Sequence, residues 1–151
     1  MELGVVTAAE RPDLAERADE ATAETVAEWM RHADTVSRYW GSLYDVYPEL
    51  QLVVYDETED AVLGEANTIH CAWDGMVAGL PGGVDDVLER AFTQEFEPDT
   101  LCALNVRIVP DHEGQGLSSV VLDEMRRLAA ERAFRACGCR KLGSGAFVVA
   151  V

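Results

Sequence analysis

The residues whose types and spacing could do chemistry lie between positions 106 and 125, in the segment VRIVPDHEGQGLSSVVLDEM. An apolar run ends at Pro110, a turn with two glycines follows, and a helical pattern begins near Leu117. Glycine lets a backbone approach an anion closely, and the first N–H groups of a helix have no partner within that helix. This order of strand, glycine turn and helix therefore predicts a phosphate site.

The backbone of the turn supplies the predicted donors, and the dipole of the following helix adds a favourable field. The residues that would present these N–H groups are Gly114, Gln115, Gly116, Leu117 and Ser118. Ser118 and Ser119 could add hydroxyl donors. A Gly-x-Gly pattern also occurs where a chain only has to bend, and on the motif alone that simpler interpretation stays open.

The wider segment IVPDHEGQGLSS resembles the acetyl-CoA-binding motif of the GCN5-related N-acetyltransferase (GNAT) superfamily. That motif is a strand ending in V-x-P, then Q/R-x-x-G-x-G/A, which opens a long amphipathic helix. Residues 108–110 match the strand end, and Gly116 is the central glycine. Glu113 stands in place of Gln or Arg, and Ser118 in place of Gly or Ala. A carboxylate beside a pyrophosphate is unfavourable unless Glu113 points away into solvent.

The resemblance, which covers roughly residues 10 to 134, implies that acetyl-CoA binds as a co-substrate. The turn at 114–118 would hold the pyrophosphate, and backbone groups near Ile108 and Val109 would hold the pantetheine arm. The implied cofactor-binding residues are Ile108, Val109, Glu113, Gly114, Gln115, Gly116, Leu117, Ser118 and Ser119. The implied reaction is transfer of an acetyl group to an amine of a small-molecule or peptide acceptor.

Acyl transfer to an amine needs a general base and later a general acid. Some members of the superfamily place a glutamate early on the motif strand, but here that place falls near Cys102, and residues 101–109 contain no carboxylate. Five other side chains could act as the base without support from their positions: His70, Asp74, Glu97, Asp99 and His112. The catalytic residues are therefore left unassigned.

The periodicity along the chain predicts an α+β fold. Helices are expected from Pro12 onward, with a break near residues 21–25, and at 84–96 and 116–134. Strands are expected at 51–56 and 61–73, as a hairpin, and at 101–109. On the last strand one apolar face is predicted, made by Cys102, Leu104, Val106 and Ile108. The resemblance implies a three-layer GNAT-like fold, with a mixed, mostly antiparallel sheet flanked by helices.

The last residues differ from the rest, so a domain at 1–134 and an atypical tail at 135–151 are predicted. No acidic residue follows Glu131, and Lys141 is the only lysine. In the superfamily the motif helix leads to another strand, another helix and a closing hairpin. We therefore expect a C-terminally incomplete fold, with a tail that forms one strand in AFVVAV or is disordered. A truncated or out-of-frame coding sequence is one hypothesis for this tail.

The composition limits the class of protein. A chain of 151 residues with 48% hydrophobic residues suggests one soluble domain, and a net charge of −16 argues against nucleic acid or an anionic membrane as partner. The chain has neither an apolar run of about 20 residues nor a basic start, so a cytoplasmic location is expected. Four cysteines and three histidines do not form a ligand set, and no metal is expected.

Two alternatives to an active enzyme remain open. The first is a non-catalytic acyl-CoA-binding or protein-interaction domain, because a shortened fold could be inactive and its open sheet edge would favour a partner or a homo-oligomer. The second is a dinucleotide-binding turn, since the residues from Gly114 to Ser119 approximate G-x-G-x-x-G. That fingerprint needs an acidic residue about 20 positions later, and this chain has none there.

Overall fold

The computed structural model describes residues 1–138, and in this part of the chain five strands form one sheet in the order β1-β2-β3-β4-β5. The strands are β1 (Leu3–Thr7), β2 (Gln51–Asp56), β3 (Ala61–Cys71), β4 (Thr100–Ile108) and β5 (Arg135–Gly138). The pairs β1–β2, β2–β3 and β3–β4 are antiparallel, whereas β5 runs parallel to β4. The predicted mixed, mostly antiparallel sheet is confirmed.

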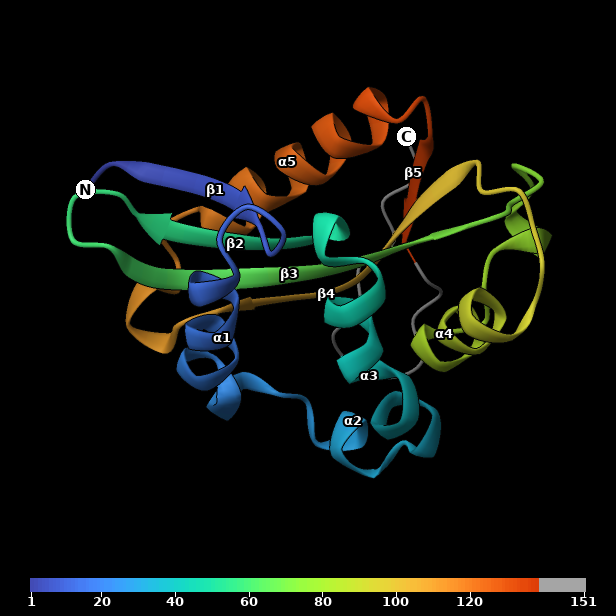
Figure 1. The fold of residues 1–151 in the computed structure, drawn as a ribbon, viewed down its shortest axis with the longest axis horizontal. Coiled ribbons are helices and arrows are strands. Elements are labelled where there is room, and N and C mark those ends of the chain that lie inside the picture. Colours follow the sequence, from blue (N-terminus) through green and yellow to red (C-terminus); the bar gives the residue numbers. More distant parts are fainter. Residues whose placement is uncertain (139–151) are drawn as a thin grey trace.

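Helices cover both faces of the sheet, which gives the three layers of the predicted α+β fold (Figure 1). Those on one face are α1 (Pro12–Ala21), α2 (Glu28–His32), α3 (Asp34–Val46) and α4 (Val84–Thr93), and α5 (Leu117–Glu131) lies on the other. Short 3-10 turns are η1 (Ala23–Thr25), η2 (Pro48–Leu50), η3 (Val77–Gly79) and η4 (Pro110–His112). The expected helix break near residues 21–25 is η1.

The first and last strands of the described chain form the two ends of the sheet. Residues 3–7 form an edge strand paired with β2, which the sequence analysis missed. At the other end, β5 begins directly after the proposed boundary at residue 134, and that boundary stays a prediction. The strand predicted in AFVVAV lies outside the described residues.

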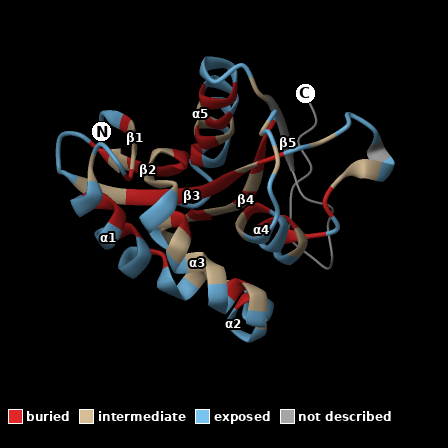
Figure 2. Cartoon of the chain, turned by 45° about the vertical axis from the view of Figure 1, so that its right-hand side comes forward, coloured by how far each residue is buried: buried red, intermediate tan, exposed pale blue. Residues whose placement is uncertain are grey.

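The core is divided between the two faces of the sheet, and buried residues run along the strands and the inner sides of the helices (Figure 2). An apolar stripe on α5 is buried against the sheet, as expected for an amphipathic helix. Its members are Leu117, Val121, Met125 and Leu128. On the other face Tyr39 of α3 stacks on Phe92 of α4, with ring centroids 5.1 Å apart.

A β-bulge at Leu104 changes the face of β4 to which each side chain points. Asn105 pairs with Asn67, but the next β3 residue, Thr68, pairs with Ala103, so Leu104 is the extra residue. One extra residue shifts the alternation of side chains by one position.

The prediction of a single apolar face on β4 is therefore wrong. Cys102 and Leu104 pack in the cluster formed with α3 and α4, whereas Val106 and Ile108 pack against the cluster formed with α5. Beyond the bulge, the polar side chains of Asn105 and Arg107 join the face that carries α1 and α3. The bulge thus places a charged side chain of β4 under α1.

Gly64 of β3 lies tightly against the backbone of β4, and replacing it tests the register beyond the bulge. A Cβ at Gly64 would lie 2.7 Å from the backbone oxygen of Arg107. We expect Gly64→Ala to lower the free energy of unfolding by about 1–3 kcal/mol, because the strands must move apart. Urea denaturation measures this.

Gly41 is the matched control. It lies within α3, and no atom lies within 4 Å of an added Cβ. Gly41→Ala should raise the free energy of unfolding by about 0.5–1 kcal/mol, because alanine favours the helix. Equal effects of the two substitutions would contradict the close approach at Gly64.

Candidate functional site

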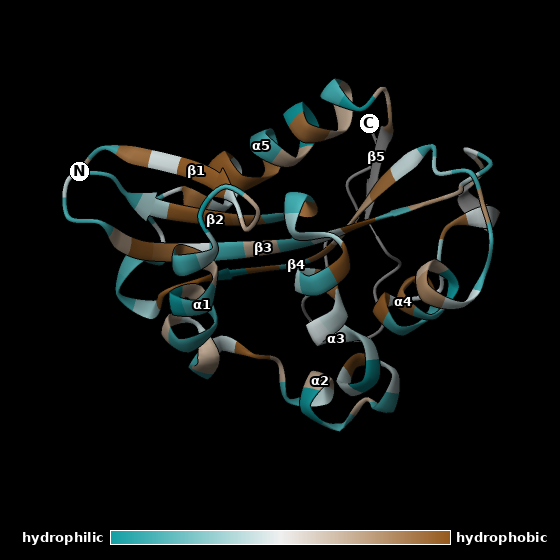
Figure 3. Ribbon diagram, in the orientation of Figure 1, coloured by the Kyte–Doolittle hydropathy of each residue, from teal (hydrophilic) through white to brown (hydrophobic). Residues whose placement is uncertain are grey.

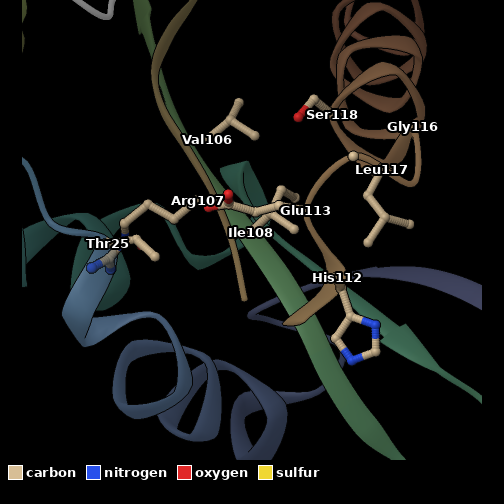
Figure 4. A pocket seen from close by; sticks show the side chains of 10 residues that line it. Thr25, Val106, Arg107, Ile108, His112, Glu113, Gly116, Leu117 and Ser118 are labelled. Carbon is tan, nitrogen blue, oxygen red and sulfur yellow. The ribbon is translucent and has the colours of Figure 1, made fainter. Parts of the chain in front are cut away.

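A cavity of about 550 Å³ lies between the C-terminal end of β4, the turn that follows it and the start of α5 (Figure 4). The turn from η1 reaches the same cavity through Thr25. The lining residues are Thr25, Val106, Arg107, Ile108, His112, Glu113, Gly114, Gly116, Leu117 and Ser118. Segments far apart in the sequence, near residues 25 and 107–118, therefore meet at one site.

The two glycines of the turn adopt a backbone conformation that disfavours other residues. Gly114 has φ +75° and Gly116 has φ +81°, both in the left-handed region. No heavy atom lies within 4 Å of a Cβ built on either residue. The glycines thus allow the bend and leave the space beside the turn open.

Gly116 is the N-cap of α5, and no side chain caps this end of the helix. The N–H groups of Ser119 and Val120 donate to the carbonyl of Gly116 at 3.0 and 3.4 Å. The N–H groups of Leu117 and Ser118 have no acceptor among the described residues. Two free donors and the positive end of the helix dipole therefore stand at the cavity, an arrangement suited to an anion.

Six of the nine residues predicted from the sequence line this cavity: Ile108, Glu113, Gly114, Gly116, Leu117 and Ser118. The other three lie beside it. The N–H of Val109 donates to the carbonyl of Leu63 at 2.9 Å, and the Gln115 amide donates to the carbonyl of Asp111 at 3.4 Å. Ser119 belongs to the first turn of α5.

Glu113 is exposed to solvent, yet it forms part of the cavity wall. Its side chain extends from the turn toward β4 (Figure 4). A carboxylate in this position adds negative charge close to the free N–H groups of α5. It would weaken the attraction of those groups for an anion.

A buried polar cluster adjoins the cavity, and the sequence analysis did not identify it. Glu65 of β3 is 1% exposed and Arg107 of β4 is 5% exposed, and a guanidinium nitrogen of Arg107 donates to the Glu65 carboxylate. The hydroxyls of Thr22 and Tyr44 each donate to the same carboxylate at 3.2 Å. Figure 3 shows hydrophilic residues within β3 and toward the C-terminal end of β4, next to hydrophobic stretches of the same strands.

Burial governs the protonation of this cluster. It raises the pKa of Glu65, and Arg107 opposes that shift by stabilising the charged carboxylate. Burial, together with the adjacent Glu65, also raises the pKa of Tyr44, which therefore remains a neutral donor. Asn67 extends the cluster, because its amide donates to the Tyr44 hydroxyl at 2.8 Å. Glu65, Tyr44 and Asn67 are thus joined by hydrogen bonds in one buried network.

One sequence signal could have revealed this cluster. Glu65 and Arg107 are opposite charges that each interrupt an apolar strand of the sequence, and in the structure those two strands are neighbours. Charged residues are rarely buried unless they are paired. Their exact pairing, Glu65 opposite Arg107, depends on the bulge, which the apolar pattern hides.

The five candidates for the general base do not meet at one place. His112 lines the cavity, whereas His70 packs on Tyr47, with ring centroids 4.7 Å apart, and burial lowers its pKa. Asp74 accepts from the N–H of Met76 at 2.8 Å, and Asp99 accepts from the N–H of Trp73 at 3.0 Å, so both shape loops. Glu97 is exposed.

Neither a cluster of metal-ligating side chains nor a membrane-spanning helix is found within residues 1–138. These residues contain no group of three or more His, Cys, Asp or Glu side chains placed to hold a metal ion. No described helix combines the length and the apolar character that a membrane span requires.

No protein-family model matches the sequence, and no curated protein matches it significantly. Solved structures do match. The loading GNATL domain of CurA from Lyngbya majuscula superposes with a TM-score of 0.60 at 12% identity, over 91% of this chain and 64% of that one.

Two further matches were solved with a thioester bound. The GphF GNAT-like decarboxylase in complex with isobutyryl-CoA has a TM-score of 0.57 at 16% identity, over 95% of this chain and 68% of that one. A GNAT family acetyltransferase from Brucella melitensis in complex with acetyl-CoA has a TM-score of 0.53 at 18% identity, over 95% and 79%.

This chain has the GNAT fold. The fold predicted from the resemblance is thereby confirmed, and the glycine turn before α5 lies on a GNAT scaffold. The chain spans 64% of the length of the CurA domain. At 12 to 18% identity the likeness concerns the fold, so activity and substrates are treated below as proposals.

The buried ion pair gives a prediction about stability. Arg107→Met should lower the free energy of unfolding by about 3–5 kcal/mol at neutral pH, because Glu65 is then buried without a cation. Folding of the variant should take up a proton at Glu65, whose pKa burial already raises. The loss should therefore shrink as the pH falls through that raised pKa toward 4.5.

The control is the double variant Glu65→Met, Arg107→Met, which replaces both charges with apolar side chains of similar length. It should recover most of the stability at neutral pH, and its stability should depend less on pH. Urea titrations across this pH range measure both effects. A loss in Arg107→Met that does not change with pH would contradict the expected protonation of Glu65.

Proposed function

We propose that the chain binds an acyl-CoA thioester in the cavity between β4 and α5. We propose further that it is part of an acyltransferase that moves an acetyl group from acetyl-CoA to an amine. The observation that carries this proposal is the pair of free N–H groups at Leu117 and Ser118, which face a cavity opened by two left-handed glycines. That arrangement suits the pyrophosphate of CoA.

The edge of β4 supports the same proposal. β5 pairs with β4 from Thr100 to Ala103, and no other described strand pairs with this edge from Leu104 to Ile108. Backbone N–H and C=O groups on an unpaired edge can bind an extended, amide-containing chain as a further strand would. The pantetheine arm is such a chain, and a phosphate at the turn would direct it along β4.

The proposed reaction is direct transfer. The amine nitrogen attacks the thioester carbonyl carbon, the carbon–sulfur bond breaks, and CoA leaves as a thiolate that takes up a proton. The amine loses one proton to a base. The acceptor is a small molecule or a peptide with an amine, in agreement with the net charge of −16, which attracts cations.

A non-catalytic acyl-CoA-binding domain is the second candidate, and one observation favours it. β4 carries no carboxylate, and its only ionisable side chain besides Cys102 is Arg107, which is paired with Glu65. Release of free CoA from acetyl-CoA in the presence of an amine panel separates the two candidates. Binding without release would support the second.

Gly116 provides the test of the anion site. Asp and Asn both tolerate the left-handed conformation and have nearly the same shape, so they differ at this position mainly in charge. Gly116→Asp should weaken acetyl-CoA binding by about tenfold more than Gly116→Asn, because it places a carboxylate beside the pyrophosphate.

Thermal-shift titrations with acetyl-CoA and, in parallel, with NAD measure this difference. NAD should shift the melting temperature less than acetyl-CoA does. Equal acetyl-CoA affinity in the Asp and Asn variants would contradict the assignment of the turn as a phosphate site. If NAD raised the melting temperature more than acetyl-CoA does, a dinucleotide site would be favoured.

Glu113 gives an independent prediction with the opposite sign. Glu113→Gln removes a carboxylate from the cavity wall and restores the residue type of the motif. It should strengthen acetyl-CoA binding by about two- to fivefold at low salt, and the gain should shrink as salt screens the repulsion. Calorimetric titration at two salt concentrations measures it.

The matched control for Glu113 is Glu89→Gln. Glu89 is an exposed carboxylate of α4 and does not line the cavity. If Glu89→Gln increased the affinity as much as Glu113→Gln, the effect would come from net charge and not from the cavity wall.

A further inference from the structure

Arg107 presents one nitrogen that its protein partners leave unused. Its Nη2 donates to Glu65 and, at 3.3 Å, to Asp19, and its Nη1 donates to the backbone oxygen of Thr22 at 3.5 Å. The Nε atom is buried and has no acceptor among the described residues. A buried N–H without an acceptor is unfavourable, so this position calls for an oxygen from outside the protein.

The unused nitrogen belongs to a side chain of the cavity wall. Arg107 is 5% exposed and lines the same cavity as the glycine turn. In Figure 4 its guanidinium lies beside Thr25, across the cavity from Gly116 and Ser118. A ligand whose phosphate binds at the turn must therefore extend over the end of β4 to reach Arg107.

The charge around Arg107 indicates the chemistry of the missing acceptor. Two carboxylates, Glu65 and Asp19, already face the guanidinium, and a second anion would have to compete with both. A neutral oxygen needs only the N–H, which Nε supplies. An amide carbonyl, a strong neutral acceptor, fits this position better than a phosphate.

We propose that Nε of Arg107 donates a hydrogen bond to an amide carbonyl oxygen of the pantetheine arm. This inference rests on the proposed acyl-CoA site and adds a side-chain contact to the backbone contacts proposed above. Glu65 orients the guanidinium, and Thr22 and Tyr44 hold the Glu65 carboxylate in turn. These contacts set the orientation of the guanidinium, and the ligand oxygen reaches the buried Nε when the cavity wall beside Arg107 opens to admit it.

Arg107→Lys tests the contact while keeping a cation beside Glu65. Lysine carries a single ammonium and cannot pair with Glu65 and also offer a donor at the position of Nε. We expect binding of acetyl-CoA and of free CoA to weaken by about tenfold, the worth of one hydrogen bond to a charged donor. Binding of adenosine 3′,5′-bisphosphate, which lacks the pantetheine arm, should stay unchanged.

The matched control is Arg126→Lys, at a surface position of α5 whose partner is Asp123. It should leave all three affinities unchanged. If Arg107→Lys does not fold, the variant Glu65→Met, Arg107→Met replaces it, with the same expected pattern. Calorimetric titration of each ligand gives the affinities.

Several results would overturn the proposal. Unchanged CoA affinity in Arg107→Lys would mean that Nε makes no contact. Equal loss of bisphosphate binding would place the contact at the phosphates, and loss with acetyl-CoA but not with CoA would place it at the thioester carbonyl. Failure of the wild-type protein to bind acetyl-CoA or CoA would reject the proposed function itself, which the other outcomes leave standing.

Discussion

The bulge at Leu104 is the constraint on which the rest of the site depends. A regular strand would place residues 102, 104, 106 and 108 on one face, but the extra residue divides them between the two faces of the sheet. Val106 and Ile108 can then pack against α5, which fixes the helix whose N-terminus faces the cavity. The same shift brings Arg107 under α1, where Glu65 meets it.

The buried cluster joins parts of the chain that the sheet alone does not hold together. Thr22 follows α1, Tyr44 belongs to α3, and both bind the carboxylate that neutralises Arg107. Buried charges of this kind often add little net stability compared with apolar residues of the same size. Here they fix the position of η1 relative to the end of β4, and these two segments form the wall opposite the glycine turn.

Local chemistry made the turn predictable from the sequence. Pro110, Gly114 and Gly116 each have a strong conformational preference, and the stripe from Leu117 to Leu128 has a clear helical period. The hairpin and the order of elements were predictable for the same reason. β1 was not, because a strand of five residues, with only Gly4 buried, gives too little alternation to detect.

The polar contacts beside the turn could not be predicted in the same way. The pairing of Glu65 with Arg107, the role of Thr25 in the wall and the approach of Glu113 toward β4 depend on the bulge and on contacts across many residues. Propensity and periodicity describe residues that are close in the sequence, so they do not predict contacts between distant residues. The resemblance to the GNAT superfamily supplied the expected fold and ligand, but it did not single out Arg107.

The position of β1 has a consequence for the order in which this protein can assemble. Every strand of the sheet lies beside the strand that follows it in the sequence, but the connection from β1 to β2 is the longest of them: Leu3 pairs with Asp56, and Thr7 with Leu52. All of α1, α2 and α3 lies in the segment between these partners. During synthesis the N-terminal residues therefore leave the ribosome first, yet they enter the sheet only after that segment and β2 have followed, and closing this long loop is the slow, entropically costly contact of the fold.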